Sequence, residues 1–273
     1  MKHVKSRIFF ITGAASGIGA ATARAAAAAG HKVVVADINL AGATALAESL
    51  GGAAMALALD ITSPAQWDSA LDAAWARFGR VDVLINNAAV VHTGYARDVS
   101  IERHGATMTT NFMGPLSGML KVLPRFRAQG SGHLVTVCSM TAFLPFPGIA
   151  SYAASKHALR AFHHALMLEE RDGPVVFTIV HPTATETPML EQEAQDDAVA
   201  MAFAGPSVTA ETVAEVIMTA IRRRSVEVFM PPERGRVVRR VGTSPRALRA
   251  LVERNEAIGA IKQKERRAAA GQS

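Results

Sequence analysis

The first residues that suggest chemistry are Tyr152 and Lys156, which stand four positions apart in the run SYAASK. An i, i+4 pair lies on one face of a helix, so we expect the lysine ammonium beside the phenol. A free tyrosine has a pKa of about 10 and is a poor base at neutral pH, but a neighbouring positive charge favours its ionised form. Lowering the pKa by about three units corresponds to about 4 kcal/mol. The pair predicts a phenol that exchanges a proton with a substrate hydroxyl.

Two further polar residues fit the same chemistry. Ser139 ends a predicted strand 13 residues before Tyr152, and its hydroxyl could hold a carbinol or carbonyl oxygen. Asn111 lies in the preceding predicted helix, where its amide could anchor a water molecule linked to Lys156. A lone tyrosine–lysine pair is usually an exposed helical pair. The chain has only two tyrosines, however, and this one follows a strand-ending serine, which favours a catalytic group.

A glycine-rich run, TGAASGIG at residues 12–19, directly follows a predicted strand and opens a predicted helix. Glycines let the backbone turn tightly and approach a pyrophosphate, which the amides and the dipole at the start of the helix attract. Such a run is a weak signal by itself, because many are only tight loops. An acidic residue at the end of the second predicted strand, Asp37, strengthens it. Together they predict a dinucleotide site.

Asp37 also bears on which dinucleotide binds. A carboxylate there accepts hydrogen bonds from the ribose hydroxyls and repels a 2′-phosphate. No Arg or Lys lies in the glycine-rich run or just after Asp37. We therefore favour NAD over NADP, and keep an NADP-linked carbonyl reductase as the alternative.

Polar residues also follow the next two predicted strands. Asp60 ends the third, and Asn86, Asn87, Ala88 and Ala89 end the fourth. This carboxyl edge is where ligands bind in open α/β sheets. Judged alone, each residue could be an ordinary cap of a strand end.

Short apolar runs alternate with longer helical patterns along the chain. The runs are rich in Val, Ile and Leu without polar alternation, as in a parallel sheet covered on both faces. The predicted strands are residues 7–12, 32–37, 54–59, 81–86, 133–139, 175–180 and 226–230. The predicted helices are residues 17–29, 40–50, 64–78, 101–126, 150–171 and 209–223. We expect an α/β Rossmann-type doubly wound sheet in one domain, residues 1–230, followed by a helical extension, residues 231–273.

The composition limits the classes of protein that this chain could belong to. Of the 273 residues, 49% are apolar, which is ample for a core, and no apolar run reaches the roughly 20 residues of a membrane span. The apolar stretch near the start is too short for a signal peptide. The single cysteine, Cys138, cannot form an intrachain disulfide, which fits a cytoplasmic protein.

The basic charge is concentrated at the end of the chain. Residues 231–273 carry eleven Arg and Lys against four Glu, a net +7, which leaves about −1 for residues 1–230. The charge is therefore a property of the extension and does not predict nucleic-acid binding by the whole protein. Ser244 and Pro245 look like the start of an amphipathic basic helix. We expect it to be solvated or packed on a partner subunit, and consider peripheral membrane contact the less favoured alternative.

The order and spacing of these motifs resemble the short-chain dehydrogenase/reductase family over roughly residues 5–230. The resemblance implies a dimer or tetramer joined through the two long helices, residues 101–126 and 150–171. It implies a catalytic tetrad of Asn111, Ser139, Tyr152 and Lys156. It implies cofactor contacts from Gly13, Ser16, Gly17, Ile18, Gly19, Asp37, Asp60, Ile61, Asn86, Ala88, Tyr152, Lys156 and Thr187.

Two positions depart from the family's pattern. After the sixth predicted strand the family usually has Pro-Gly and then a threonine that binds the cofactor's carboxamide. Thr187 matches that threonine, but Thr183 replaces the glycine, and Ala89 replaces the last glycine of the usual NNAG run. These changes leave cofactor binding in place and bear on the nicotinamide pocket and the sheet packing.

The segments expected to cover the substrate, residues 140–147 and 188–207, are bulky and apolar and contain no Arg or Lys. We therefore expect a lipophilic secondary alcohol or ketone (steroid-like, retinoid-like or long-chain) and no charged acid or sugar phosphate. The other interpretation of these apolar residues is simple packing against the sheet.

Other chemistries find less support. The nine histidines form no H-E-x-x-H motif, and the adjacent His163 and His164 diverge on a helix, so we expect no metal site. No G-x-S-x-G surrounds a serine, which argues against a hydrolase. The alternative from another class is a nucleotide-binding regulatory or scaffold protein that has the fold without turnover. The complete tetrad argues against it.

Overall fold

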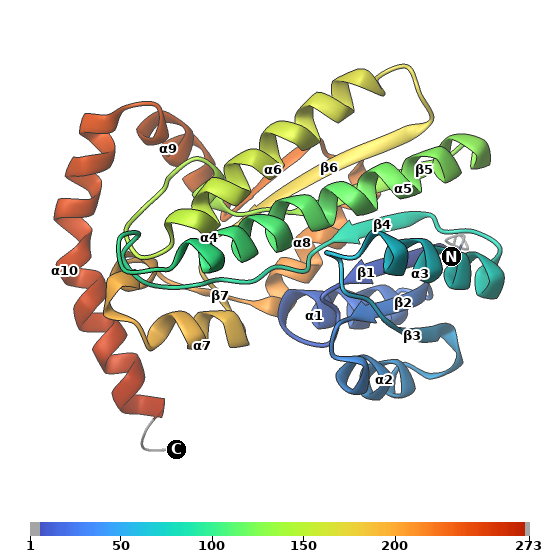
Figure 1. Cartoon of the computed structure of the whole chain (residues 1–273), viewed down its shortest axis with the longest axis horizontal. Helices are drawn as coiled ribbons and strands as arrows, with labels where there is room; N and C mark the ends of the chain where they lie inside the picture. The colour runs from blue at the N-terminus through green and yellow to red at the C-terminus, as the bar shows by residue number, and fades with distance from the viewer. Residues whose placement is uncertain (1–5, 271–273) are drawn as a thin grey trace.

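The centre of the structure, a computed structural model that describes residues 6–270, is a parallel β-sheet. Within those residues seven strands form it in the order β3-β2-β1-β4-β5-β6-β9, and every neighbouring pair is parallel (Figure 1). The strands are β1 Ile8–Thr12, β2 Lys32–Asp37, β3 Ala54–Ala58, β4 Val83–Asn86, β5 Gly132–Val137, β6 Val175–Pro182 and β9 Glu227–Met230. The strand order reverses between β1 and β4, so a crevice opens at the carboxyl ends of these strands. The doubly wound fold expected from the sequence is confirmed.

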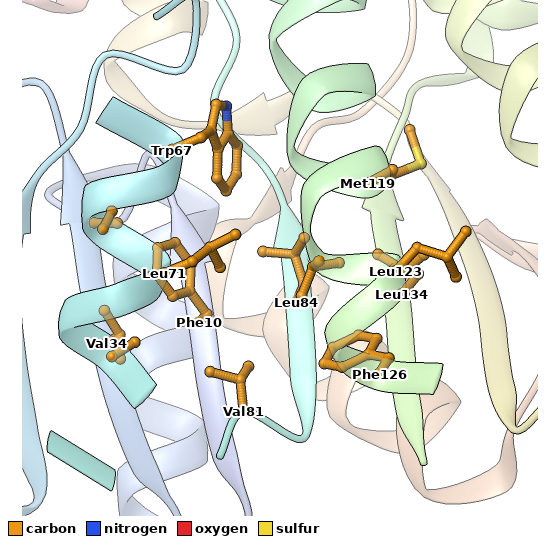
Figure 2. Packing of buried hydrophobic residues seen from close by; sticks show 14 of the residues in the cluster. Phe10, Val34, Trp67, Leu71, Val81, Leu84, Met119, Leu123, Phe126 and Leu134 are labelled. Carbon is orange, nitrogen blue, oxygen red and sulfur yellow. The ribbon is translucent and has the colours of Figure 1, made fainter. Parts of the chain in front are cut away.

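Helices cover both faces of the sheet. One face carries α1 Gly17–Ala28, α2 Leu40–Ser49 and α8 Ala210–Arg223. The other carries α3 Pro64–Phe78, α5 Gly114–Gln129 and α6 Ala150–Glu169. Figure 2 shows the core under the second group, where Phe10 and Leu84 of the sheet meet Trp67 of α3 and Phe126 of α5. All four side chains are fully buried, which explains why the strands read as uninterrupted apolar runs.

Local sequence signals set the ends of α3. The Ser63 hydroxyl accepts a hydrogen bond from the amide of Gln66, and Pro64 occupies the first turn, where its missing N–H has no cost. Gly79 ends the helix in the left-handed conformation with φ 75°. Both ends therefore lie where the sequence predicted them.

The long helix expected over residues 101–126 is divided into three parts. α4 Ile101–Met108 passes through a π-helical segment, η2 Thr109–Met113, into α5. A π-helical turn holds one more residue than an α-helical turn and often marks a functional position. The widened turn here contains Asn111, one of the predicted catalytic residues. The 3.6-residue apolar repeat in the sequence does not predict such a turn.

The C-terminal extension folds back on its own chain. It forms α9 Pro232–Gly242 and α10 Pro245–Ala270, and α10 packs against the 3₁₀ segment η4 Asp197–Phe203 and approaches α7 Pro188–Ala194 (Figure 1). A Cβ on Gly259 would lie 2.0 Å from the carbonyl oxygen of Ala200, so only glycine allows this approach. The sequence led us to expect a solvated or subunit-packed helix, and the structure differs because tertiary contacts, which the helical pattern does not encode, bury Gly259 and Gln263.

The remaining elements are short. They are η1 Gly51–Ala53, η3 Met140–Ala142 and a small parallel pair, β7 Thr185–Glu186 with β8 Val208–Thr209. Residues 1–5 and 271–273 are outside the described residues, so the start of the chain and the outer ends of the two expected units, 1–230 and 231–273, are not tested. Among residues 6–270 no helix is both long and apolar enough to span a membrane.

Candidate active site

A cavity of about 1030 Å³ opens at the carboxyl edge of the sheet. At one end it reaches the loops that follow β1, β2 and β3, and at the other it reaches α7, α9 and α10. Of the predicted site residues, those that line it are Gly13, Ser16, Gly17, Ile18, Asp37, Asp60, Ile61, Ala88, Ser139, Tyr152, Lys156 and Thr187. Sequence motifs from seven different segments therefore converge on one cavity.

The glycine-rich loop packs so closely on its neighbours that two of its glycines could not carry a side chain. Gly13 has φ 63°, and a Cβ there would lie 2.7 Å from the Cα of Ala88. Gly17 has φ 52°, and a Cβ there would lie 3.0 Å from a methyl carbon of Thr187. The side chain of Ser16, the N-cap of α1, makes no capping hydrogen bond. The first-turn amides of α1 thus lack a side-chain cap, and together with the helix dipole they suit a pyrophosphate.

Asp37 joins the ends of β1 and β2 at the edge of the cavity. Its carboxylate accepts hydrogen bonds from the amides of Ala15 and Asn39, both at 2.9 Å. These bonds hold the carboxylate beside the glycine-rich loop. The cations that line the cavity, among the residues described, are Lys156 and Arg234, and neither belongs to the loop around Asp37.

A set of hydrogen bonds that the sequence analysis missed holds the glycine-rich loop in place. The side-chain amide of Asn87 donates to the carbonyl oxygens of Thr12 and Gly13, both at 3.0 Å. The hydroxyl of Thr12 accepts from the amides of Asn87 and Ala88. The signal was present as the second asparagine of the NNAA run, but only the structure shows that it links β4 to the glycine-rich loop.

Three predicted cofactor or catalytic residues lie behind the cavity wall. Gly19 is tucked against the carbonyl oxygen of Gly13 and the side chain of Asn87, which explains its lack of a side chain. Asn86 is 3% exposed, and its amide has no hydrogen-bond partner among the described residues. The amide of Asn111 is bonded on both sides to the backbone of Val90, at 2.8 Å each. The Asn111 side chain thus ties η2 to the loop after β4, with one bond from its nitrogen and one to its oxygen.

The predicted catalytic residues Tyr152 and Lys156 both line the cavity. Tyr152 and Ser139 line the same cavity, and the side chain of Ser139 acts to lower the pKa of the phenol. The ammonium of Lys156 lies 5.4 Å from the centroid of the Tyr152 ring and donates to the carbonyl oxygen of Val137 at 3.2 Å. Tyrosine, serine and lysine therefore meet as the spacing predicted, with the lysine partly engaged by the strand beneath.

Burial governs the protonation of this pair. It raises the pKa of Tyr152, with the charges of Glu193 and Cys138 adding to the rise and the hydrogen bond to Ser139 opposing it. Burial lowers the pKa of Lys156. The expected lowering of the tyrosine pKa by Lys156 is therefore outweighed in the protein alone, and the phenol is protonated there.

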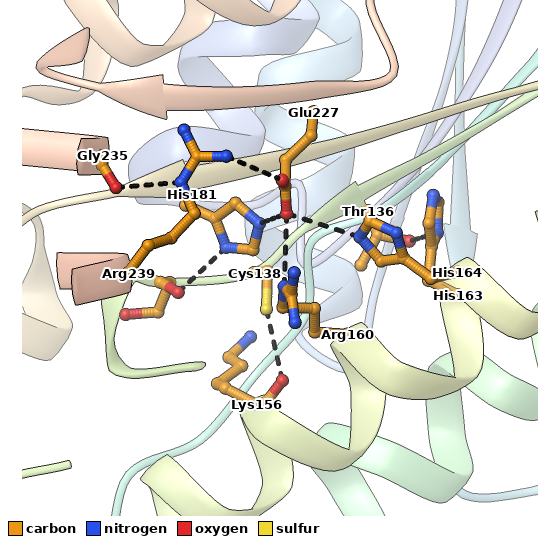
Figure 3. Close-up of polar contacts among 11 residues, drawn as sticks. Thr136, Cys138, Lys156, Arg160, His163, His164, His181, Glu227, Gly235 and Arg239 are labelled. Carbon is orange, nitrogen blue, oxygen red and sulfur yellow. Dashed lines mark hydrogen bonds and ion pairs between the residues drawn. The ribbon is translucent and has the colours of Figure 1, made fainter. Parts of the chain in front are cut away.

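A cluster of charged residues surrounds the fully buried His181, whose neighbours Glu227 and Arg160 are partly buried (Figure 3). One ring nitrogen of His181 is 3.0 Å from the carbonyl oxygen of Ser139, and the other is 3.0 Å from Glu227. Arg160 also donates to Glu227, at 3.2 Å. The sequence analysis did not single out these residues, because their contacts join β6, β9 and α6.

The far end of the cavity contains charges that the sequence analysis did not place there. Glu193 of α7, Arg234 of α9 and Asn255 of α10 line it beside apolar residues. Arg234 donates to the hydroxyl of Thr183 at 2.6 Å. The segments that were expected to cover the substrate, residues 140–147 and 188–207, contain no Arg or Lys. Arg234 of α9 nevertheless lines the cavity, so the extension forms part of its wall. The motifs carried no signal for these contacts.

Comparison with protein families agrees with this architecture. The family model described as short chain dehydrogenase matches residues 7–198. The chain belongs to the short-chain dehydrogenase/reductase family and is an oxidoreductase of that family.

Individual relatives fit the same assignment. The chain is 34% identical over 190 residues to 2,5-dichloro-2,5-cyclohexadiene-1,4-diol dehydrogenase of Sphingobium indicum, covering 68% of this chain and 76% of the relative. It is 31% identical over 190 residues to 3-alpha-(or 20-beta)-hydroxysteroid dehydrogenase of Mycobacterium tuberculosis, covering 70% and 73%. A short-chain dehydrogenase/reductase of Burkholderia phymatum, solved in complex with NAD, superposes with a TM-score of 0.81 at 27% identity, covering 88% of this chain and 94% of that one.

Proposed function

We propose that the protein is an NAD(H)-dependent oxidoreductase that interconverts a lipophilic secondary alcohol and its ketone, with Tyr152 as the general acid and base. The observation that carries the proposal is that Tyr152, with the Lys156 ammonium 5.4 Å from its ring centroid, lines the same cavity as Ser139, the glycine-rich loop and Asp37. A proton-transferring phenol beside a dinucleotide site is the arrangement that this reaction needs.

Each of the cavity residues would have its own role in the reaction. Bound NAD would supply the hydride acceptor and a positive charge at the nicotinamide ring. The Ser139 hydroxyl would hold the substrate oxygen, and the Tyr152 oxygen would take the hydroxyl proton during oxidation and return it during reduction. Lys156, buried beneath the tyrosine, would stabilise the phenolate as it forms. Because the phenol is protonated in the protein alone, it is already in the state that reduction requires.

NAD is favoured over NADP by Asp37. Its carboxylate is fixed by two backbone amides at the position where the resemblance places the ribose hydroxyls. The relative from Burkholderia phymatum was solved with NAD, which supports the same choice. The residues proposed to hold the dinucleotide are those of the glycine-rich loop, Asp37, Asp60, Ile61, Ala88 and Thr187, with Gly19, Asn86 and Asn111 supporting the cavity wall from behind.

The substrate end of the cavity favours an apolar molecule. Its wall is mainly Met, Leu, Phe, Ile and Val side chains. By their names, two relatives act on a chlorinated cyclohexadiene diol and on hydroxysteroids, both of which are ring alcohols. We propose a ring alcohol or the corresponding ketone.

We further propose a cytoplasmic homodimer or homotetramer joined through α4–α5 and α6. Large apolar side chains on these elements are exposed in the single chain. They are Ile101, Met113, Leu120 and Leu168. A symmetric interface would cover them.

The experiment that tests the function measures NADH formation from a panel of lipophilic secondary alcohols, with NAD and with NADP. The wild type should turn over ring alcohols with NAD, and Tyr152→Phe should lose roughly 1,000-fold or more in kcat while its affinity for NAD is unchanged. Activity in Tyr152→Phe equal to that of the wild type would contradict the assigned role. If the wild type bound NAD but turned over no alcohol of the panel, a scaffold protein would be favoured. Tighter binding of NADP than of NAD would favour the NADP-linked reductase.

A further inference from the structure

The far end of the cavity is mostly apolar, with one acidic exception. Its apolar walls come from the loop after β5, from α7 and η4, and from the extension. They are Met140, Leu144, Phe146, Ile149, Met189, Met201, Val237 and Leu251. Glu193 of α7 lies among them, and it is only 9% exposed. A carboxyl group is rarely buried in such surroundings without a partner.

The position of Glu193 is fixed by the backbone around it. The buried Gln263 of α10 donates to the carbonyl oxygens of Glu193, at 3.2 Å, and Asp196, at 2.8 Å. Gln192 donates to the carbonyl oxygen of Val91 at 3.1 Å, which ties α7 to the loop after β4. α7 is thus held from two sides, which fixes the backbone from which the Glu193 side chain reaches the cavity.

The carboxyl of Glu193 has no partner among the residues that the structure describes. No hydrogen bond or ion pair from residues 6–270 reaches its oxygens, although Arg234 lies in the same cavity, where it is bonded to Thr183. Burial raises the pKa of Glu193 to about 7. Its charge is near enough to Tyr152 to raise the pKa of the phenol. An acceptor that is desolvated, fixed and unpaired beside the reacting group has the properties of a ligand-recognition residue.

We propose that Glu193 is a specificity-determining residue that accepts a hydrogen bond from a second hydroxyl of the substrate. The substrate class is then an apolar ring diol or hydroxyketone, in which Tyr152 acts on one oxygen and Glu193 binds the other. This inference rests on the proposed function, because it places the second hydroxyl relative to the oxygen that Tyr152 serves.

A hydroxyl fits this site better than a charged group. A carboxylate or phosphate on the substrate would meet the negative charge of Glu193. An ammonium would share an apolar cavity with the cation Arg234. A hydroxyl needs only an acceptor, and a carboxyl group whose pKa is near 7 keeps an acceptor oxygen in both protonation states.

The experiment compares matched alcohols that differ in one group. The probes are cyclohexanol with the cyclohexanediols and aminocyclohexanol, and indanol with the indanediols and aminoindanol. We expect the wild type to prefer a diol over its mono-alcohol by about 10- to 100-fold in kcat/KM, the loss that follows when a substrate cannot pair a buried charged group. Glu193→Leu should remove this preference. The control Glu215→Gln, which changes an exposed acidic residue of α8 that does not line the cavity, should keep it.

A measurement without turnover separates this inference from the proposed function. The diols should raise the melting temperature of the wild type and not that of Glu193→Leu, in the absence of cofactor. Oxidation of mono-alcohols and diols at equal rates by both proteins would overturn the role of Glu193 and leave the function intact. A preference for the amino alcohols would overturn the choice of a hydroxyl. Selective stabilisation by diols without any turnover would support Glu193 as a binding residue and overturn the proposed reaction.

Discussion

His181 and Glu227 form a buried ion pair directly behind the serine of the active site. The ring of His181 is fully buried, with one nitrogen 3.0 Å from Glu227 and the other 3.0 Å from the carbonyl oxygen of Ser139 (Figure 3). Since both neighbours are acceptors, the ring donates on both sides when it is protonated. Burial alone would lower the pKa of His181, but hydrogen bonds to Cys138, Glu227 and Ser139 outweigh it and raise the pKa to about 9.

The first prediction concerns the pH dependence of this pair. The pKa of His181 rises from 6.5 to about 9, so its stabilisation is complete below pH 6.5 and is lost as pH rises through 9. Burial opposes the ionisation of Glu227, but the hydrogen bond and charge of His181, with Arg160, lower its pKa from 4.5 to about 2. The stabilisation from ionised Glu227 is therefore fully present above pH 4.5 and is lost as pH falls through 2.

Glu227→Gln should lower the free energy of unfolding by roughly 3–5 kcal/mol at pH 6, the cost of leaving a buried charge unpaired. The difference from the wild type should shrink by pH 10, where His181 is neutral. It should not vanish, because Arg160, His164 and Arg239 also lie within 4.0 Å of Glu227. Urea denaturation at the two pH values measures this. A difference that is the same at both would show that the histidine does not titrate with the pair.

The second prediction concerns Asp37 and the choice of dinucleotide. Asp37→Asn removes the negative charge and keeps an acceptor oxygen for one of the two loop amides. We expect the ratio of the Kd values for NADP and NAD to fall by about 10-fold, which corresponds to about 1.4 kcal/mol of relieved repulsion. Titration of intrinsic fluorescence with each dinucleotide measures the ratio. The control Glu48→Gln removes an exposed charge of α2 and should leave the ratio of the two Kd values unchanged. If Asp37→Asn and Glu48→Gln had the same ratio, Asp37 would not be the residue that discriminates between the dinucleotides.

The sequence predicted the sheet well because each strand is a short apolar run and each helix between strands has its own start and stop signals. β2 and α3 have the predicted bounds. The π-helical turn around Asn111 was missed, because a shift in backbone hydrogen bonding leaves the pattern of side chains almost unchanged. The return of α10 to η4 was missed because it depends on the fit of Gly259 and Gln263 to a distant surface.

The candidate site was predictable where it is built from motifs and unpredictable where it is built from packing. The glycine-rich loop follows β1, Ser139 follows β5 and Tyr152 starts the helix after β5, and they converge because the carboxyl ends of these parallel strands lie at the same edge of the sheet. Glu193 is an ordinary acidic residue in a helical stretch, and nothing in the sequence distinguishes it from the exposed Glu191 two positions away. Only the burial of one face of α7 under the extension does so.

The third prediction is that Glu193 destabilises the protein as pH rises. Its pKa increases from 4.5 in an exposed carboxyl to about 7, so the unfolded chain releases the proton first. Stability should therefore fall between pH 4.5 and 7 by up to about 3 kcal/mol from this group and stay level above. Glu193→Leu should be more stable than the wild type, with a larger difference at pH 8 than at pH 5, in thermal denaturation without ligand. A Glu193→Leu protein that is less stable at pH 8 would mean that the carboxyl has a stabilising partner.

The last prediction concerns the link between the extension and the substrate end of the cavity. Gln263→Leu removes the donor that serves the carbonyl oxygens of Glu193 and Asp196, both at the end of α7. Leaving these buried acceptors unpaired should lower the free energy of unfolding by about 1–3 kcal/mol. Because the same bonds fix Glu193, the KM for the preferred diol should rise several-fold while kcat with a saturating mono-alcohol changes little. Lys264→Ala, at the exposed neighbouring position of α10, should change neither quantity, as a surface substitution changes stability by about 0.5 kcal/mol or less. Steady-state kinetics with both alcohols, beside thermal denaturation, separate the two effects. A loss of stability with an unchanged KM would mean that α10 supports the fold and does not position the cavity wall.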